Sequence, residues 1–223
     1  MTVAGIAALL APFSVLQSEP VQRERIEKRQ PKRTAPDLAE EGYRAGLQLL
    51  DRGRPDAAKE RFRTTLQRHP THAATRHALF VLLLQAGDLA GAEQTLVEGL
   101  QLDSSQAGFA MALARLQAGR GDFEAAVETL VASAPAGEMN HDYLAFLAAV
   151  LQRHGRHAEA VEQYDRALAL DPESGVSLTG LGISLQALGR NAAAREAFNR
   201  AHRTEGLSPE LRAFAEQRLR HLR

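Results

Sequence analysis

A glycine recurs at intervals of 34 residues through most of the 223-residue chain, at Gly53, Gly87, Gly121, Gly155 and Gly189. An alanine follows each glycine after five residues, and Phe, Leu or Tyr follows it after nine. Glycine ends a helix at little cost because it adopts positive φ, and alanine lets a second helix approach closely. The period therefore predicts a stack of helix pairs, each of which buries its apolar face against its neighbours.

Composition favours an all-α fold. The strong helix formers alanine and leucine account for 40 and 32 residues, and aromatic residues make up only 5% of the chain. The chain has no cysteine, which excludes a disulfide framework, a thiolate metal site and a cysteine nucleophile.

The first 36 residues differ from the repeats. Residues 3–16 are apolar apart from one serine, and residues 17–36 are basic, contain three prolines and are predicted to be a disordered linker. The apolar stretch would span about 21 Å as a helix, short of a hydrocarbon core of about 30 Å. It indicates either a buried or frayed segment or the end of a membrane span that begins upstream. A signal peptide is disfavoured because no lysine or arginine precedes the stretch.

Charge is distributed unevenly although the total is zero. The net charge is +3 over residues 1–36, −5 over residues 37–207 and +2 over residues 208–223. We therefore divide the chain into an apolar N-terminal segment (1–16), a basic linker (17–36), a repeat array (37–207) and a capping helix (208–223).

The residues within each unit resemble the tetratricopeptide repeat (TPR) family. Its pattern of small, small, aromatic, small and proline recurs most fully in the fourth repeat, at Ala148, Ala160, Tyr164, Ala167 and Pro172. The resemblance implies an all-α, right-handed α-solenoid of five TPR helix pairs, followed by a C-terminal capping helix with Ser208 as its N-cap. The departures are Phe80 at a small position, and Ser104 and Glu138 where proline is usual.

In the TPR family, the concave wall takes positions 2, 5, 9 and 12 of the first helix of each pair. These positions are mostly apolar here, which favours an apolar or amphipathic segment of a partner protein. The predicted partner-binding residues are Tyr43, Leu47, Leu50, His77, Val81, Leu84, Met111, Arg115, Gln152, Ile183 and Gln186. The alternative for any apolar member is that it completes the core. A carboxylate-terminated tail is disfavoured, because the lysine-and-asparagine clamp of chaperone-binding TPR domains is absent.

The sequence contains no recognisable catalytic constellation. His154 and His157 have the spacing of metal ligands, but they straddle a turn between helices and no acidic residue is placed to complete a site. We interpret them as solvated turn histidines, and interpret His69 and His72 in the same way. Basic residues are not interleaved with aromatic ones, which disfavours nucleic-acid binding. The expectation is a protein-binding scaffold that is not an enzyme and holds no cofactor and no metal.

The C-terminal third is similar to the end of the TPR protein of mannose-sensitive haemagglutinin (MSHA) type IV pilus biogenesis, above all in LSPELRAFAEQRL at residues 207–219. This resemblance implies a bacterial inner-membrane protein whose periplasmic TPR array scaffolds pilus assembly. Such a span would place the basic residues 23–33 outside the cytoplasm, against the positive-inside tendency. The alternatives are a soluble cytoplasmic TPR adaptor or co-chaperone-like protein, and a scaffold that assembles with copies of itself.

Overall fold

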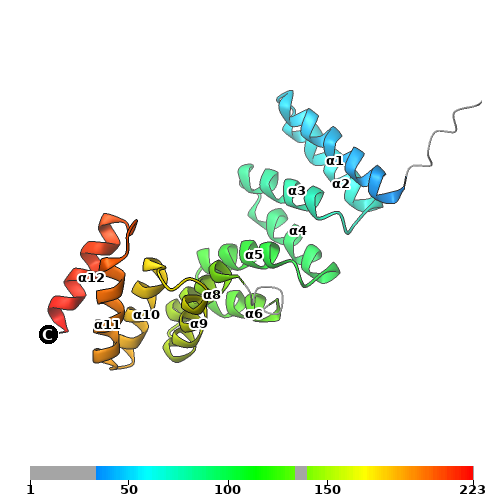
Figure 1. Cartoon of the computed structure of the whole chain (residues 1–223). Helices are drawn as coiled ribbons and strands as arrows, with labels where there is room; N and C mark the ends of the chain where they lie inside the picture. Colours follow the sequence, from blue (N-terminus) through cyan, green and yellow to red (C-terminus); the bar gives the residue numbers. More distant parts are fainter. Residues whose placement is uncertain (1–33, 134–139, 223) are drawn as a thin grey trace, which may run out of the picture. The chain divides into compact units, whose positions relative to one another are not determined.

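The computed structural model describes residues 34–133 and 140–222, and every regular element in these two ranges is an α-helix (Figure 1). The helices are α1 (Ala35–Asp51), α2 (Pro55–Arg68), α3 (Ala73–Gln85), α4 (Leu89–Leu102), α5 (Ala107–Gly119), α6 (Phe123–Ala132), α8 (His141–Arg153), α9 (His157–Leu170), α10 (Gly175–Ala187), α11 (Asn191–Arg203) and α12 (Pro209–His221). Each of the pairs α1/α2, α3/α4, α5/α6, α8/α9 and α10/α11 packs on the first helix of the next, and α12 packs on α11. The predicted α-solenoid of five helix pairs and a terminal helix is confirmed.

The recurring glycine ends the first helix of every pair. The five glycines have φ between 67° and 85°. In the first pair, the Gly53 N–H donates to the Leu50 carbonyl at 2.8 Å, and the Arg54 N–H donates to the Leu49 carbonyl at 2.9 Å. The same two hydrogen bonds close the first helix of the other four pairs, so one local motif satisfies the last carbonyls at each turn.

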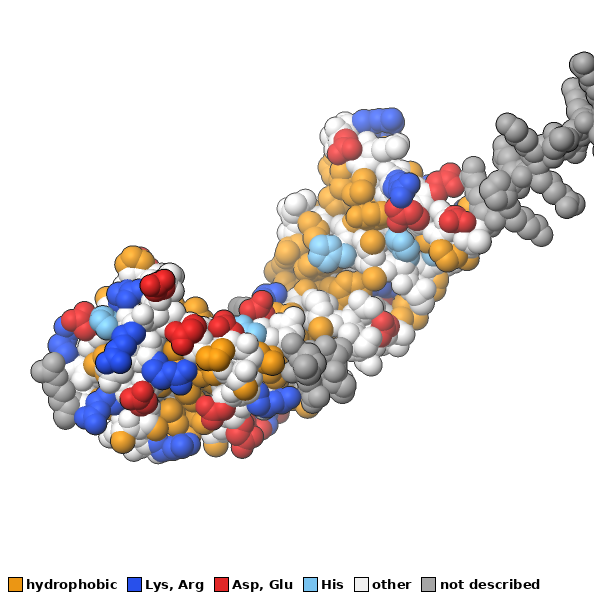
Figure 2. Space-filling view, viewed as in Figure 1, with side chains coloured by type: hydrophobic (Ala, Val, Ile, Leu, Met, Phe, Trp, Pro, Cys, Tyr) orange, Lys and Arg blue, Asp and Glu red, His pale blue; other side chains and the backbone are white. Residues whose placement is uncertain are grey.

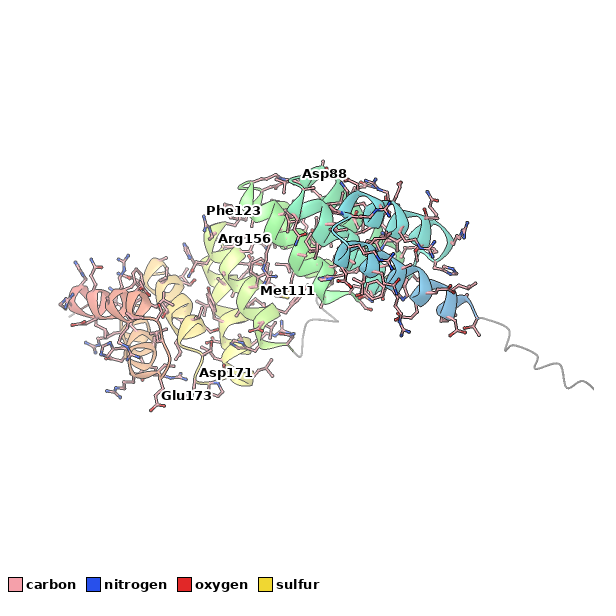
Figure 3. All side chains as sticks on the ribbon, turned by 90° about the horizontal axis from the view of Figure 1, so that it is seen from above. Asp88, Met111, Phe123, Arg156, Asp171 and Glu173 are labelled. Atoms are coloured by element: carbon pink, nitrogen blue, oxygen red, sulfur yellow. The ribbon has the colours of Figure 1, made fainter. Side chains whose placement is uncertain are left out.

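The turns within pairs and the loops between pairs lie on opposite edges of the array. Figure 3 shows Asp88, Phe123 and Arg156, which follow the glycine turns, along one edge, and Asp171 and Glu173, from the loop between α9 and α10, at the other. The repeated turn therefore presents the first helix of every pair in the same orientation.

Close contact between the two helices of a pair requires one small residue opposite each large one. The alanines of the repeat are completely buried, and so is Phe62 of α2. A Cβ atom at Gly46 of α1 would overlap the Phe62 ring, and a Cβ at Gly182 of α10 would lie 2.7 Å from Cε1 of Phe198. These positions exclude even a methyl group unless the facing ring moves.

The second pair meets the same requirement with different residues. Phe80 occupies the position that is small in the other repeats, and Leu96, a smaller residue than phenylalanine, occupies the position of the large residue in α4; both are buried in one cluster. The departure noted in the sequence thus changes which helix supplies the ring without disturbing the pair.

The buried side chains form two clusters that meet at α5. Phe109 and Leu113 belong to the cluster of the first two pairs, whereas Ala110 and Ala114 belong to the cluster that continues through α8 to α12. Because α5 contributes to both clusters, it joins the two halves of the array.

The array begins slightly earlier than the sequence predicts. Thr34 is the N-cap of α1: its hydroxyl accepts from the Asp37 N–H at 3.4 Å, and the Asp37 carboxylate accepts from the Thr34 N–H at 2.9 Å. Pro36, which we assigned to the linker, lies in the first turn of the helix, where proline is well tolerated. Ser208 caps α12 as predicted, accepting from the Leu211 N–H at 3.3 Å.

The segment 1–16 and most of the linker 17–36 lie outside the described residues. Within residues 34–133 and 140–222, no helix combines the length and apolar character needed to cross a membrane.

Gly46→Ala is expected to lower the free energy of unfolding by about 1–3 kcal/mol, because the Phe62 ring must shift to admit the methyl group. The matched control is Gly108→Ala in α5, where an added Cβ meets nothing within 4 Å and the better helix former is expected to raise stability by about 0.5–1 kcal/mol. Urea denaturation followed by circular dichroism measures both. Equal changes in the two variants would show that the α1–α2 approach is not tight.

Candidate functional site

The predicted binding residues lie on one surface, which we call the first-helix face. It consists of positions 2, 5, 9 and 12 of the first helix of each pair, α1, α3, α5, α8 and α10. None of the eleven predicted residues is buried, but they differ in how much of each side chain solvent reaches. Solvent therefore reaches the eleven side chains to different extents, and their role in partner binding stays a prediction.

Several apolar members of the face also serve the core. They are only partly accessible and pack against the buried clusters: Tyr43, Leu47, Leu50, Val81, Met111 and Ile183. The centroid of the Tyr43 ring lies 6.2 Å from the centroid of the Phe62 ring and 5.9 Å from that of the His72 ring. These residues combine a packing role with a limited exposed surface. The alternative that they complete the core therefore describes part of what they do.

The side-chain amide group of Gln152 makes two hydrogen bonds within the fold. Its side-chain amide donates to the Gly180 carbonyl and to the Ser184 hydroxyl of α10, both at 2.7 Å. Gln152 therefore ties α8 to α10, and its role as a contact residue stays a prediction. Gln186, at the equivalent position of α10, is partly accessible.

Three predicted residues, His77, Leu84 and Arg115, are exposed and gather at one place. They line a cleft of about 360 Å³ between α3 and α5, which we call the α3/α5 cleft. Phe80 and Phe109 form part of its wall. Figure 2 shows apolar and histidine surface side by side over the first helix pairs, which agrees with this lining. The cleft is apolar with a polar edge, as the sequence predicts for this face.

A second cleft of about 420 Å³ lies between α5 and α8 next to the start of α6, and we call it the α5/α8 cleft. Arg115 lines both clefts, so they adjoin. The Arg115 guanidinium lies 4.9 Å from the centroid of the Phe146 ring, and the Arg153 guanidinium lies 5.3 Å from that of Phe123. Of these four residues, only Arg115 was predicted from positions 2, 5, 9 and 12 of the first helix. The other three stand at different positions of the repeat.

The histidines that we interpreted as solvated are partly engaged, which corrects that interpretation. His72 is the N-cap of α3: its Nδ1 accepts from the Thr75 N–H at 3.3 Å. The His154 Nε2 lies 2.7 Å from Glu124 Oε2, so an acidic residue is in place beside it. His157 is half-buried and its Nδ1 has no partner among the described residues. In that part of the chain no three His, Cys, Asp or Glu residues come together as metal ligands would.

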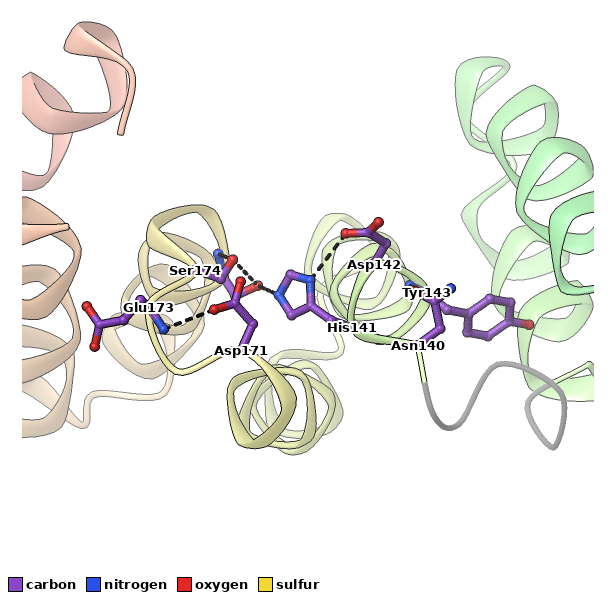
Figure 4. A network of polar contacts seen from close by, with 8 residues as sticks. Asn140, His141, Asp142, Tyr143, Asp171, Glu173 and Ser174 are labelled. Carbon is purple, nitrogen blue, oxygen red and sulfur yellow. Dashed lines mark hydrogen bonds and ion pairs between the residues drawn. The ribbon is translucent and has the colours of Figure 1, made fainter. Parts of the chain in front are cut away.

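A contact between α8 and α10 has the order carboxylate, imidazole, hydroxyl. The His141 Nδ1 lies 3.2 Å from Asp142 Oδ1, and its Nε2 lies 3.2 Å from the Ser177 hydroxyl (Figure 4). A nucleophilic hydroxyl has to reach a substrate, but Ser177 has no exposed surface, while Asp142 is exposed. These three residues connect two helices and do not form an attacking group.

Tyr143, beside this contact, anchors α8 to α6. Its hydroxyl donates to the Leu130 carbonyl at 2.6 Å, and burial raises the pKa of Tyr143 to about 12. The phenol is therefore neutral throughout the physiological pH range and acts as a hydrogen-bond donor to the core of the third pair.

Comparison with known proteins agrees with this architecture. A sequence model of the tetratricopeptide repeat family matches residues 49–101 and 83–150, and a second model of that family matches residues 141–204. Together they cover well over half of the chain. The chain belongs to the tetratricopeptide repeat family.

Solved structures with a similar fold include two kinds of protein. YrrB, described as a TPR protein with an unusual peptide-binding site, aligns with a TM-score of 0.66 at 13% identity over 83% of this chain and 98% of its own. MamA from Desulfovibrio magneticus RS-1 aligns with a TM-score of 0.62 at 18% identity over 76% of this chain and 96% of its own. At these identities the likeness concerns the fold. No curated protein matches the sequence significantly.

Gln152→Ala is expected to lower the free energy of unfolding by about 1–3 kcal/mol, because it leaves the Gly180 carbonyl and the Ser184 hydroxyl without their donor. Gln186→Ala, the same change at the equivalent position of α10, is expected to stay within about 0.5 kcal/mol of the unchanged protein. Thermal and urea denaturation test the pair. A Gln152 variant as stable as the Gln186 variant would contradict the role that we assign to this amide.

Proposed function

We propose that this TPR protein is a protein-binding scaffold that takes a segment of its partner on the first-helix face, in the α3/α5 and α5/α8 clefts. The observation that carries the proposal is the pair of adjoining clefts, which share Arg115 and are lined mainly by apolar side chains. TPR proteins are interaction scaffolds, and at these clefts this chain presents Leu84, an exposed large apolar side chain, beside the exposed Arg115 and Arg153.

The dimensions of the clefts suit side chains of a peptide segment. Clefts of about 360 and 420 Å³ each admit a few side chains, and two adjoining clefts match a segment that places side chains in both. Leu84 is 40% exposed, although large apolar side chains gain from burial. An apolar or amphipathic partner segment would supply that burial.

We propose, as a finer assignment, that the scaffold works in type IV pilus assembly at the inner membrane, with residues 3–16 as the end of a membrane span. Support comes from the resemblance of residues 207–219 to the MSHA biogenesis protein. In the structure these residues cover most of the capped helix α12, where Arg212 donates to the Thr204 carbonyl at 2.9 Å. The competing proposal is a soluble cytoplasmic adaptor.

Leu84→Asp is expected to reduce capture of partner proteins from cells of the source organism at least about tenfold, because an unpaired charge would be placed in the apolar cleft. Leu84 suits this test better than Tyr43 or Leu47, which also pack on the core. Leu170→Asp is the matched control: Leu170 is 43% exposed, lies at the end of α9 and lines neither cleft. Quantitative mass spectrometry of the captured proteins compares the variants, and undiminished capture by Leu84→Asp would contradict the proposed face.

Fractionation of cells that express the full chain tests the pilus assignment. We expect the protein in the membrane fraction after a wash with salt, and expect removal of residues 1–16 to release it, because the apolar stretch would no longer anchor it. Removal of residues 208–223 is the control and should leave the protein with the membrane. Recovery of the full chain entirely from the cytosol would favour the adaptor instead.

A further inference from the structure

The α5/α8 cleft contains two arginines for which the described residues provide no ion pair. Arg115 and Arg153 are exposed, and neither has a carboxylate partner in the described part of the chain. Other arginines there do have one: Arg120 pairs with Glu93, and Arg156 with Glu159. The α5/α8 cleft therefore holds two guanidinium groups that can bind an acidic partner.

Among the described residues, the two clefts contain no acidic side chain, although the array as a whole has a negative net charge. Residues 37–207 carry a net charge of −5. Among the described residues that line the two clefts there is nevertheless no aspartate or glutamate, whereas His77, Arg115 and Arg153 are present. The clefts are thus a basic, apolar area on an acidic array.

Both guanidinium groups lie over phenylalanine rings. Arg115 lies over Phe146 and Arg153 over Phe123, and these cation–π contacts restrict the side chains while leaving guanidinium N–H groups for a further ligand. A guanidinium held in this way loses less rotamer entropy when it binds, and its planar fork matches the two oxygens of a carboxylate. The geometry is suited to a carboxylate ligand.

The walls around the arginines are apolar. Ala118, Ala149 and Val150 line the α5/α8 cleft together with the two phenylalanines. A carboxylate that enters this cleft would therefore be accompanied by apolar surface, which favours a peptide segment over a nucleic acid or an inorganic anion.

We propose that the partner segment carries aspartate or glutamate side chains flanked by apolar residues, and that Arg115 and Arg153 bind these carboxylates. The proposal rests on the proposed function, because it specifies the chemistry of the segment that occupies the first-helix face. Arg115 lines both clefts, so a carboxylate bound to it would lie between the apolar side chains that fill them.

The test is selection from a display library of random peptides of about twelve residues on the purified full chain. It is run in parallel on Arg115→Gln/Arg153→Gln and on Arg195→Gln/Arg203→Gln. The second variant is the matched control, since it removes the same charge from two exposed residues of α11 that line neither cleft. Circular dichroism and thermal melting establish that both variants are folded.

We expect peptides enriched in Asp and Glu beside apolar residues from the unchanged chain and from the control, and no acidic enrichment from Arg115→Gln/Arg153→Gln. Replacing Glu by Gln in a selected peptide should weaken its binding to the unchanged chain at least about tenfold, equivalent to about 1.4 kcal/mol, and should have little effect on binding to the cleft variant.

The other outcomes separate this proposal from the proposed function. Peptides selected without acidic enrichment, or with an enrichment that survives Arg115→Gln/Arg153→Gln, would overturn the acidic-segment proposal and leave a peptide-binding face in place. If no recovered peptide loses binding to the Leu84→Asp variant, both proposals are overturned.

Discussion

The close approach of the two helices in each pair is the contact on which the rest of the structure depends. It requires a small residue on one helix opposite a large one on the other, as at Gly46 and Phe62. When this contact forms, the apolar face of each helix is buried within its own pair and against the next pair. Part of the surface of each first helix stays accessible, as at Leu84 and Arg115, and this surface belongs to the first-helix face.

The requirement concerns the size of the contacting pair more than the identity of either residue. In the second pair the first helix carries the ring, Phe80, and the second helix has Leu96 at the large position, and both residues are buried. At α5 the array passes from one buried cluster to the other, with Phe109 and Leu113 on one side and Ala110 and Ala114 on the other. With both flanks of α5 occupied by core packing, Arg115 is directed to the surface where the two clefts meet.

Local features of the fold were predictable from the sequence, and features that depend on distant contacts were not. The glycine period identified the turns, because each turn is closed by hydrogen bonds within a few residues of Gly53 and its equivalents. The structural role of Gln152 was missed because its hydrogen-bond partners belong to the next repeat, at Gly180 and Ser184. Phe123 was missed because its stacking with Arg153 depends on how α6 meets α8, which repeat positions do not encode.

The packing rule also explains where a protein of this family can acquire specificity. A change at Gly46 or Phe62 disturbs the pair, so those positions are constrained by the fold. Arg115 and Arg153 lie outside that constraint, since they are exposed and contact the framework through the faces of two phenylalanines. Lysine would not replace them equally, because an ammonium group lacks the planar fork that stacks on a ring while it binds a carboxylate. The placement of arginine side chains on phenylalanine rings where two apolar clefts meet is thus a property of the binding surface. The helix-pair fold does not itself require it.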